Sequence, residues 1–213
     1  PSAYPSAMTY DFFTYAGAPG AYNLALGAGA GVYWKSDDFS ISTSYLSING
    51  NLSCPNNETC ENGGGIGTDA ADFSATTQIA YAPENWGIAA AYTKASGNSA
   101  KLYSGNANPA GIAISGMGSQ TNSWGLSAWW TPEESGWVPS ISTGLGMTYA
   151  DAPGDDEESA SWYVGFEWDD VFLEGNSFGM AVGQPTFDTD SDRGNGYAWE
   201  FFYKFQVTDN ISV

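Results

Sequence analysis

The chain has 213 residues, of which 24 are acidic and 5 are basic, so its formal net charge is −19. We expect no nucleic-acid partner, because phosphate binding needs clustered Lys and Arg side chains. No histidine is present, which removes the usual general base of a hydrolase, and we therefore expect neither an enzyme nor a cofactor.

Aromatic residues make up 15% of the chain and charged residues 14%, with 27 Gly and 9 Trp. The apolar residues are mostly Trp, Tyr, Phe and Ala, and they alternate with Gly, Ser and Thr, which is typical of strands with two different faces. No apolar stretch approaches the roughly 18 residues of a membrane-spanning helix. If the chain crosses a bilayer, it must do so as a closed barrel, because lipid cannot satisfy an open sheet edge.

Nine segments of the chain show this alternation, and each is predicted to be a strand. In the first segment Leu26, Val32 and Trp34 share one parity and several glycines share the other. Since successive side chains of a strand point to opposite faces, each segment has one bulky apolar face and one small face. The nine segments are residues 22–34, 39–48, 72–82, 85–94, 124–130, 141–149, 162–168, 178–183 and 199–207. A tenth strand is expected to begin within residues 210–213.

Short turns flanked by aromatic residues alternate along the chain with long, mostly polar loops such as residues 49–71 and 95–121. The acidic runs at residues 155–158 and 188–192 are also interpreted as connections. A transmembrane barrel has tight turns at one end, long loops at the other, and aromatic girdles at the two membrane interfaces. We predict girdle positions at Trp34, Tyr81, Trp86, Trp130, Trp137 and Trp168.

Alternation alone does not distinguish a soluble β-sandwich from a membrane barrel, since the apolar face points inward in the first and outward in the second. Three features favour the barrel. The strands are about ten residues long, against five or six in most soluble sheets; their ends carry Trp and Tyr; and the small face has few charges. A propeller needs four strands per repeat unit, and each unit here has two. The predicted fold is all-β, a transmembrane antiparallel up-and-down β-barrel with about ten strands in this chain.

Charged side chains are rare on the small face, which would line the water-filled interior of the barrel. By parity, Glu167, Glu200, Lys204 and Gln206 belong to it. Glu200 and Lys204 either set up a transverse field that tunes ion passage or merely add to the polarity of a wet lumen. The acidic connections are either solvated loops or a funnel that concentrates cations at the channel mouth. The loop at 95–121 could narrow the pore, cover its rim or pack in an oligomer interface.

Two cysteines, Cys54 and Cys60, lie within one long polar loop. We expect a local disulfide between them, which implies an oxidising compartment. The alternative is a pair of free loop thiols, and a metal site would need more ligands than two cysteines.

Asp188, Asp190 and Asp192 imitate the start of a calcium-binding loop, because alternating Asp residues can supply clustered carboxylate oxygens. The glycine that should follow is one place late, no Glu stands at the twelfth position, and no helices flank the run. We therefore expect no metal site and keep the three residues as weak candidates, with a solvated turn as the alternative.

Residues 123–132, 178–185 and 197–213 resemble strand-and-turn segments of cyanobacterial outer-membrane porins. These are the iron-uptake porins, which are related to the carbohydrate-selective porins. The resemblance extends from about Tyr22 to the end of the chain. It implies a barrel of about sixteen strands, assembly as a homotrimer, and passive diffusion of small solutes and inorganic ions, with iron as a suggested cargo.

Members of this porin family commonly carry an N-terminal region that binds peptidoglycan, and their barrel closes with a C-terminal strand. Residues 1–213 contain neither a wall-binding region nor a final strand that ends in an aromatic residue. The whole chain is therefore interpreted as part of a single porin β-barrel domain of a longer protein, in which any contact with peptidoglycan would need a region not present here.

The leading functional hypothesis is a general diffusion porin in the bacterial outer membrane, which contacts lipid and prefers cations. Two alternatives remain open. One is a secreted or surface β-sandwich module that binds carbohydrate by stacking sugars on exposed Trp. The other is a structural barrel that is plugged and does not conduct.

Overall fold

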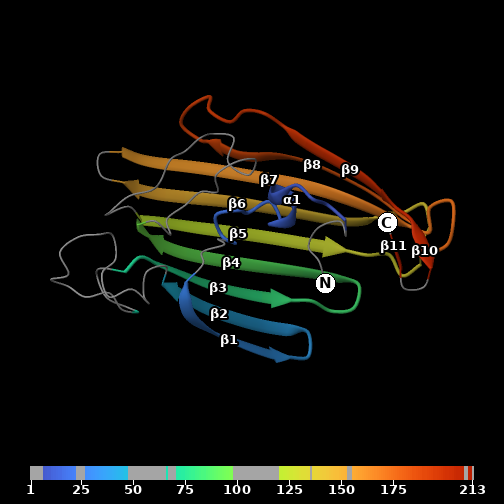
Figure 1. Ribbon diagram of the computed structural model, residues 1–213, viewed down its shortest axis with the longest axis horizontal. Coiled ribbons are helices and arrows are strands. Elements are labelled where there is room, and N and C mark those ends of the chain that lie inside the picture. The colour runs from blue at the N-terminus through green and yellow to red at the C-terminus, as the bar shows by residue number, and fades with distance from the viewer. Residues whose placement is uncertain are drawn as a thin grey trace.

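The computed structural model describes residues 7–22, 27–47, 66, 71–97, 120–134, 136–152, 155–208 and 211–212. Within these residues the main element is one nine-stranded antiparallel sheet, in which every strand pairs with its neighbour in sequence (Figure 1). Its strands are β1 (Ala28–Ser36), β2 (Phe39–Ser47), β3 (Phe73–Tyr81), β4 (Trp86–Ser96), β5 (Gln120–Trp130), β6 (Ser140–Ala152), β7 (Asp155–Asp169), β8 (Ser177–Asp188) and β9 (Ala198–Lys204). The prediction of an all-β, antiparallel up-and-down fold is thereby confirmed.

The helical content of the described residues is confined to α1 (Asp11–Thr14), a single four-residue turn. Figure 1 shows α1 lying across one face of the sheet, in front of the central strands. Nowhere in the described part of the chain does a helix have the length and apolar character of a membrane span.

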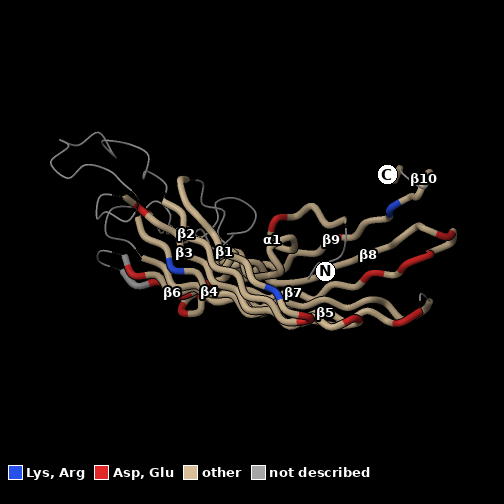
Figure 2. Tube along the Cα trace, turned by 90° about the horizontal axis from the view of Figure 1, so that it is seen from below, with Lys and Arg blue, Asp and Glu red and all other residues tan. Residues whose placement is uncertain are grey.

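The sheet curves around the N-terminal part of the chain. Figure 2 shows it on edge as a trough, with α1 on the concave side. We call the concave face the inner face and the convex face the outer face. Within the described residues β1 and β9 lie at the two ends of the strand order and are not paired with each other, so this part of the chain forms an open curved sheet.

Large apolar side chains point to the outer face and small ones to the inner face, as the period-two alternation predicts. Strand β5 illustrates the pattern, because Trp124, Leu126 and Trp130 are exposed while Ser123 and Ser127 are buried. Residues paired across an antiparallel ladder share a face, so the register carries this asymmetry from strand to strand across the sheet. The buried side of the sheet is therefore its small side.

Each of the nine predicted segments overlaps one strand of the nine-stranded sheet, but the ends of the strands differ from the prediction. The first segment was expected to begin at Tyr22, whereas β1 begins at Ala28. Tyr22 instead closes a turn on the inner face, where its N–H donates to the carbonyl oxygen of Ala18 (3.2 Å). Local hydrogen bonding within the turn therefore replaces strand pairing at this position.

The acidic run at residues 155–158 was interpreted as a connection, and this was wrong, because it forms the start of β7. The ladder between β6 and β7 continues to the pair Ala152 and Asp155. Backbone groups make the ladder, so charged side chains at the end of a hairpin do not prevent it. Arg193 also pairs with Glu157 at 2.5 Å, which offsets part of the charge of the run.

The last predicted strand is broken in two. β9 ends at Lys204, while β10 (Gln206–Thr208) pairs with β11 (Ile211–Ser212) in a separate two-stranded sheet. Asn176, at the end of the β7–β8 turn, explains the break. Its Oδ1 accepts the N–H of Gln206 (2.8 Å), and its Nδ2 donates to the hydroxyl of Tyr203 (2.9 Å). The N–H of Gln206 therefore binds the side chain of Asn176. In a longer β9 this N–H would have been available for pairing within the sheet.

Replacing Asn176 by Ala should lower the free energy of unfolding by about 2 kcal/mol, because two hydrogen bonds of a buried side chain are lost at about 1 kcal/mol each. Amide hydrogen exchange at Gln206 should accelerate in this variant and stay slow in Asn176→Asp, which keeps the acceptor. Equal exchange at Gln206 in wild type and Asn176→Ala would contradict this explanation of the break.

Candidate functional site: the two faces of the sheet

The outer face carries a line of aromatic residues close to the short turns, which we call the short-turn row. It consists of Trp34, Phe39, Tyr81, Trp86, Trp130, Trp168, Phe178 and Tyr203. Strand register aligns these residues, since Phe39 lies opposite Tyr81 and Trp86 lies opposite Trp130. Rings also meet across the turns, as for Trp34 and Phe39, whose centroids are 6.0 Å apart. The row therefore follows the short-turn end of the whole sheet.

Five of the six predicted girdle residues belong to this row. The sixth, Trp137, lies in the connection between β5 and β6 and is 98% exposed. Its carbonyl oxygen accepts a hydrogen bond from Nε1 of Trp168 (3.1 Å), so the backbone of this turn is joined to the row.

A second line of aromatic residues, the long-loop row, crosses the other end of the outer face, and the predicted girdle did not include it. It consists of Tyr45, Phe73, Tyr92, Trp124, Tyr149 and Trp162. The rings of Tyr92 and Trp124 have centroids 4.4 Å apart, and the Tyr92 hydroxyl donates to Oδ1 of Asn122 (2.7 Å). The sequence contains a signal for this row. On β2, β4, β5 and β7, one of its aromatic residues lies six residues along the chain from an aromatic residue of the short-turn row.

Apolar side chains make up most of the outer face between the two rows. The aliphatic ones include Ile41, Ile79, Ile88, Leu126, Leu145, Val164 and Val182, all exposed or half-buried. The register also places Phe166, Trp199 and Phe201 there, with Thr43, Thr77 and Thr143. Six residues span about 20 Å along a strand, so the two rows bound an apolar band about 20 Å tall between Cα positions. The aromatic rings of the rows extend the band farther at both edges.

Residues 7–22, which we call the N-terminal segment, cover the inner face from β4 to β9. Phe12 and Phe13 of α1 are fully buried, as is Tyr163 of β7, and the rings of Phe13 and Tyr163 lie 6.0 Å apart. Ala181 and the half-buried Phe202 also pack in this cluster. The core of the described structure is thus formed between the N-terminal segment and the small face of the sheet.

Glycines of the inner face give the segment room to approach the strands. A Cβ added at Gly144 would collide with the carbonyl oxygen of Ala16, and one added at Gly125 would come within 2.9 Å of the Cβ of Ala18. One added at Gly183 would lie 2.9 Å from Cε1 of Phe12. Small side chains on this face are therefore a packing requirement as well as a property of the strands.

Hydroxyl groups of the inner face bind the backbone of the segment. Oγ of Ser161 donates to the carbonyl oxygen of Gly17 (2.7 Å), and Oγ1 of Thr93 donates to that of Ala21 (2.5 Å). The two bonds lie on β7 and β4, so the segment bridges strands that are far apart in the sheet.

Glu200 of β9, predicted as a pore-lining residue, receives the start of the segment. One carboxylate oxygen accepts the backbone N–H of Thr9 (2.9 Å) and its hydroxyl (2.8 Å), and the other accepts the N–H of Tyr10 (3.0 Å). These donors are 190 and 191 residues away in sequence. No local pattern could have identified this contact.

The other predicted pore-lining residues occupy different places. Glu167, on β7, and Lys204, the last residue of β9, share the inner face with Glu200. Asp169 shares this face with Lys204, because both lie opposite Ser177, and the sequence prediction did not include it. Gln206 lies in β10, outside the nine-stranded sheet.

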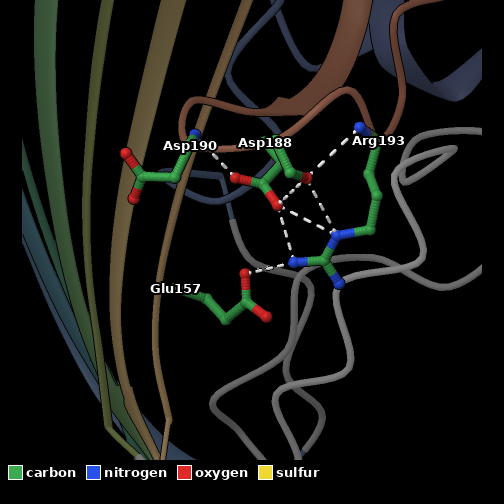
Figure 3. A network of polar contacts seen from close by, with 5 residues as sticks. Glu157, Asp188, Asp190 and Arg193 are labelled. Carbon is green, nitrogen blue, oxygen red and sulfur yellow. Dashed lines mark hydrogen bonds and ion pairs between the residues drawn. The ribbon is translucent and has the colours of Figure 1, made fainter.

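The end of β8 and the loop after it contain a polar network around Asp188 (Figure 3). By register, Asp188 lies beyond Trp162 of the long-loop row. Oδ2 of Asp188 accepts from Oγ of Ser191 (2.5 Å) and from Nε (2.9 Å) and Nη2 (2.6 Å) of Arg193. Its Oδ1 accepts the N–H of Asp190 (2.8 Å). Hydrogen bonds from the Ser191 hydroxyl and the Asp190 N–H, and to a smaller extent from Arg193, lower the pKa of Asp188 to about 2. Conversely, Glu157 and Asp188 raise the pKa of Arg193.

The three weak calcium candidates do not converge. Figure 3 shows the carboxylate of Asp190 pointing away from that of Asp188, and Oδ1 of Asp192 accepts from Nδ2 of Asn195 (3.2 Å). Arg193 supplies the positive charge beside Asp188. Among the described residues there is no group of three or more His, Cys, Asp or Glu side chains able to hold a metal ion.

Two sequence predictions concern residues outside the described part of the chain. Cys54 and Cys60 lie there, and so does most of the loop at 95–121, residues 98–119. The disulfide and the role of this loop remain predictions.

The chain is similar to the uncharacterized protein alr4550 of Nostoc sp., with 29% identity over 211 residues that cover 92% of this chain and 34% of that protein. The chain thus spans about a third of the length of this relative. No protein-family model and no solved structure matches the chain.

Proposed function

We propose that the chain is part of an outer-membrane β-barrel that acts as a porin, a water-filled channel for passive diffusion of small solutes and inorganic ions. The observation that carries the proposal is the outer face, where an exposed, mainly apolar band lies between two rows of aromatic residues. Outer-membrane barrels have this arrangement, an apolar band about 25 Å tall flanked by aromatic girdles.

The size of the band argues against exposure to water. Nine strands spaced about 4.8 Å apart make a face about 40 Å wide, and with a height of about 20 Å its area is about 800 Å². The largest apolar patch on a typical soluble monomer is about 300–600 Å². Hydrocarbon is the environment that would accept this band without a further protein layer.

Tyr and Trp at the margins of the band fit the two interfaces of a bilayer, because their rings combine an apolar body with a polar group. Tyr92 and Trp168 illustrate this, since the hydroxyl of the first and the Nε1 of the second each donate a hydrogen bond to a polar group of the protein. A soluble sheet has no need for aromatic rows at both ends of its strands.

A barrel requires strands beyond the nine of the described sheet, because the free edges of β1 and β9 must be paired within hydrocarbon. The relative in Nostoc sp. is about three times as long as this chain, which leaves room for more strands in a protein of this kind. By resemblance to cyanobacterial porins, we propose about sixteen strands, a homotrimer, and iron among the transported ions.

Cation preference follows from the charge of the chain. Its formal charge of −19 includes acidic residues at the long-loop end of β6 to β8, such as Asp151, Glu158 and Asp190. A negative rim raises the local concentration of cations at a channel mouth.

A plugged structural barrel is the second candidate, and the N-terminal segment on the inner face favours it. The β-sandwich alternative loses support, because in the described residues the only other sheet is the small β10–β11 pair, which does not cover the apolar band. Conductance measurements separate the two barrel candidates.

Leu126 is exposed in the middle of the apolar band, so its replacement by Arg tests which medium it faces. With the protein folded into lipid vesicles, Leu126→Arg should lower the free energy of unfolding by about 2–4 kcal/mol. An exposed position in water would change it by no more than about 0.5 kcal/mol. Glu133→Arg, in the short turn after β5, is the matched control and should be nearly neutral in denaturant titrations.

Reversal potentials across planar bilayers under a salt gradient test the channel itself. We expect conductance with a preference for cations that weakens as ionic strength rises, because the Debye length falls from about 10 Å at 0.1 M to about 3 Å at 1 M. Anion selectivity would contradict the role of the acidic rim, and absence of conductance would favour the plugged barrel.

A further inference from the structure

We propose that the N-terminal segment is a releasable constriction of the channel and that Glu200 is the residue that holds it in place. This inference rests on the proposed function, since it concerns the passage along the inner face. It assigns Glu200 a positioning role rather than a direct effect on passing ions. It also assigns the narrowing of the passage to residues 7–22.

The segment occupies the part of the trough where the passage would run. Figure 2 shows α1 within the concavity of the sheet rather than at its rim. The segment touches strands from β4, through Thr93, to β9, through Glu200. In a closed barrel a body in this position reduces the open cross-section of the lumen.

The segment is attached in a way that allows its release. Backbone hydrogen bonds of residues 13–22 are made within the segment, for example from Phe13 to Tyr10 and from Tyr22 to Ala18. Side chains bind the segment to the strands, for example those of Ser161, Thr93 and Glu200. The ladders of β4 to β9 are complete without it. Displacing the segment would therefore expose the cluster around Phe12 and Phe13 but break no strand pairing.

Glu200 is the strongest polar attachment, because one carboxylate binds two backbone N–H groups and one hydroxyl. Hydrogen bonds to an ionised acceptor are roughly twice as strong as neutral ones. The contact also joins Thr9 and Tyr10, at the N-terminal end of the segment, to β9. Its loss would therefore free the segment from this end.

Single-channel conductance of the complete protein in planar bilayers tests the proposal with three variants. Glu200→Ala removes the attachment, Glu200→Gln keeps part of it, and Gly144→Ala inserts a methyl group where the carbonyl of Ala16 lies. Gly31→Ala is the matched control on the inner face of β1, where the added Cβ would lie 3.2 Å from the carbonyl oxygen of Thr43 and no part of the segment is near.

We expect Glu200→Ala and Gly144→Ala to raise the conductance about twofold or more, because conductance increases with the open cross-section. Glu200→Gln should give an intermediate value, and Gly31→Ala should conduct as wild type does. A rise in the conductance of Glu200→Ala would point to release of the segment. Loss of an acidic group from a cation-preferring lumen would by itself lower the conductance.

A second readout does not depend on ion flow. Ser123 is buried beneath Gly20, so Ser123→Cys should react slowly with a water-soluble maleimide, and faster when combined with Glu200→Ala. Circular dichroism of each variant establishes that the sheet is retained. If Gly144→Ala does not fold, the comparison of Glu200→Ala and Glu200→Gln with wild type still tests the proposal.

The outcomes separate the two proposals. If wild type conducts and neither the conductance nor the labelling of Ser123→Cys changes in the Glu200 variants, the constriction is refuted and the porin function stands. If neither wild type nor any variant conducts, the porin function is refuted and the constriction with it. If only the released variants conduct, the segment closes the resting channel completely.

Discussion

The structure depends on one constraint, the size difference between the two faces of most strands of the sheet. Antiparallel register carries this difference across nine strands, so bulky side chains gather on the convex face and Gly, Ala, Ser and Thr on the concave one. A one-residue slip in any pairing would exchange the faces. The exposed apolar band and the room for the N-terminal segment are both consequences of this register.

The two faces support different parts of the proposed function. The outer face offers aliphatic groups to lipid tails and aromatic rows to the interfaces, while the inner face offers hydroxyls, glycines and a few charges. Polar side chains of the inner face form hydrogen bonds with the N-terminal segment. Ser161 donates to the carbonyl oxygen of Gly17, and Glu200 accepts from the hydroxyl of Thr9. A resident segment would make the passage narrower than the strand count alone implies.

Local patterns were sufficient to predict the strands and their faces, because the alternation around residues such as Trp124 and Leu126 depends only on the two-residue repeat of a strand. They also predicted five of the eight residues of the short-turn row. They failed where distant groups compete for the backbone, as when Asn176 takes the N–H of Gln206 and ends β9. The docking of Thr9 on Glu200 joins positions 191 residues apart, and periodicity contains no information on such contacts.

The central claim is that the outer face meets hydrocarbon, and quenching of tryptophan fluorescence by brominated lipids tests it most directly. In vesicles, the Trp residues of both rows should be quenched, and more strongly by bromines placed near the two interfaces than by bromines at the bilayer centre. A protein that stays in plain buffer without detergent, does not associate with the vesicles and keeps its tryptophan emission would contradict the account.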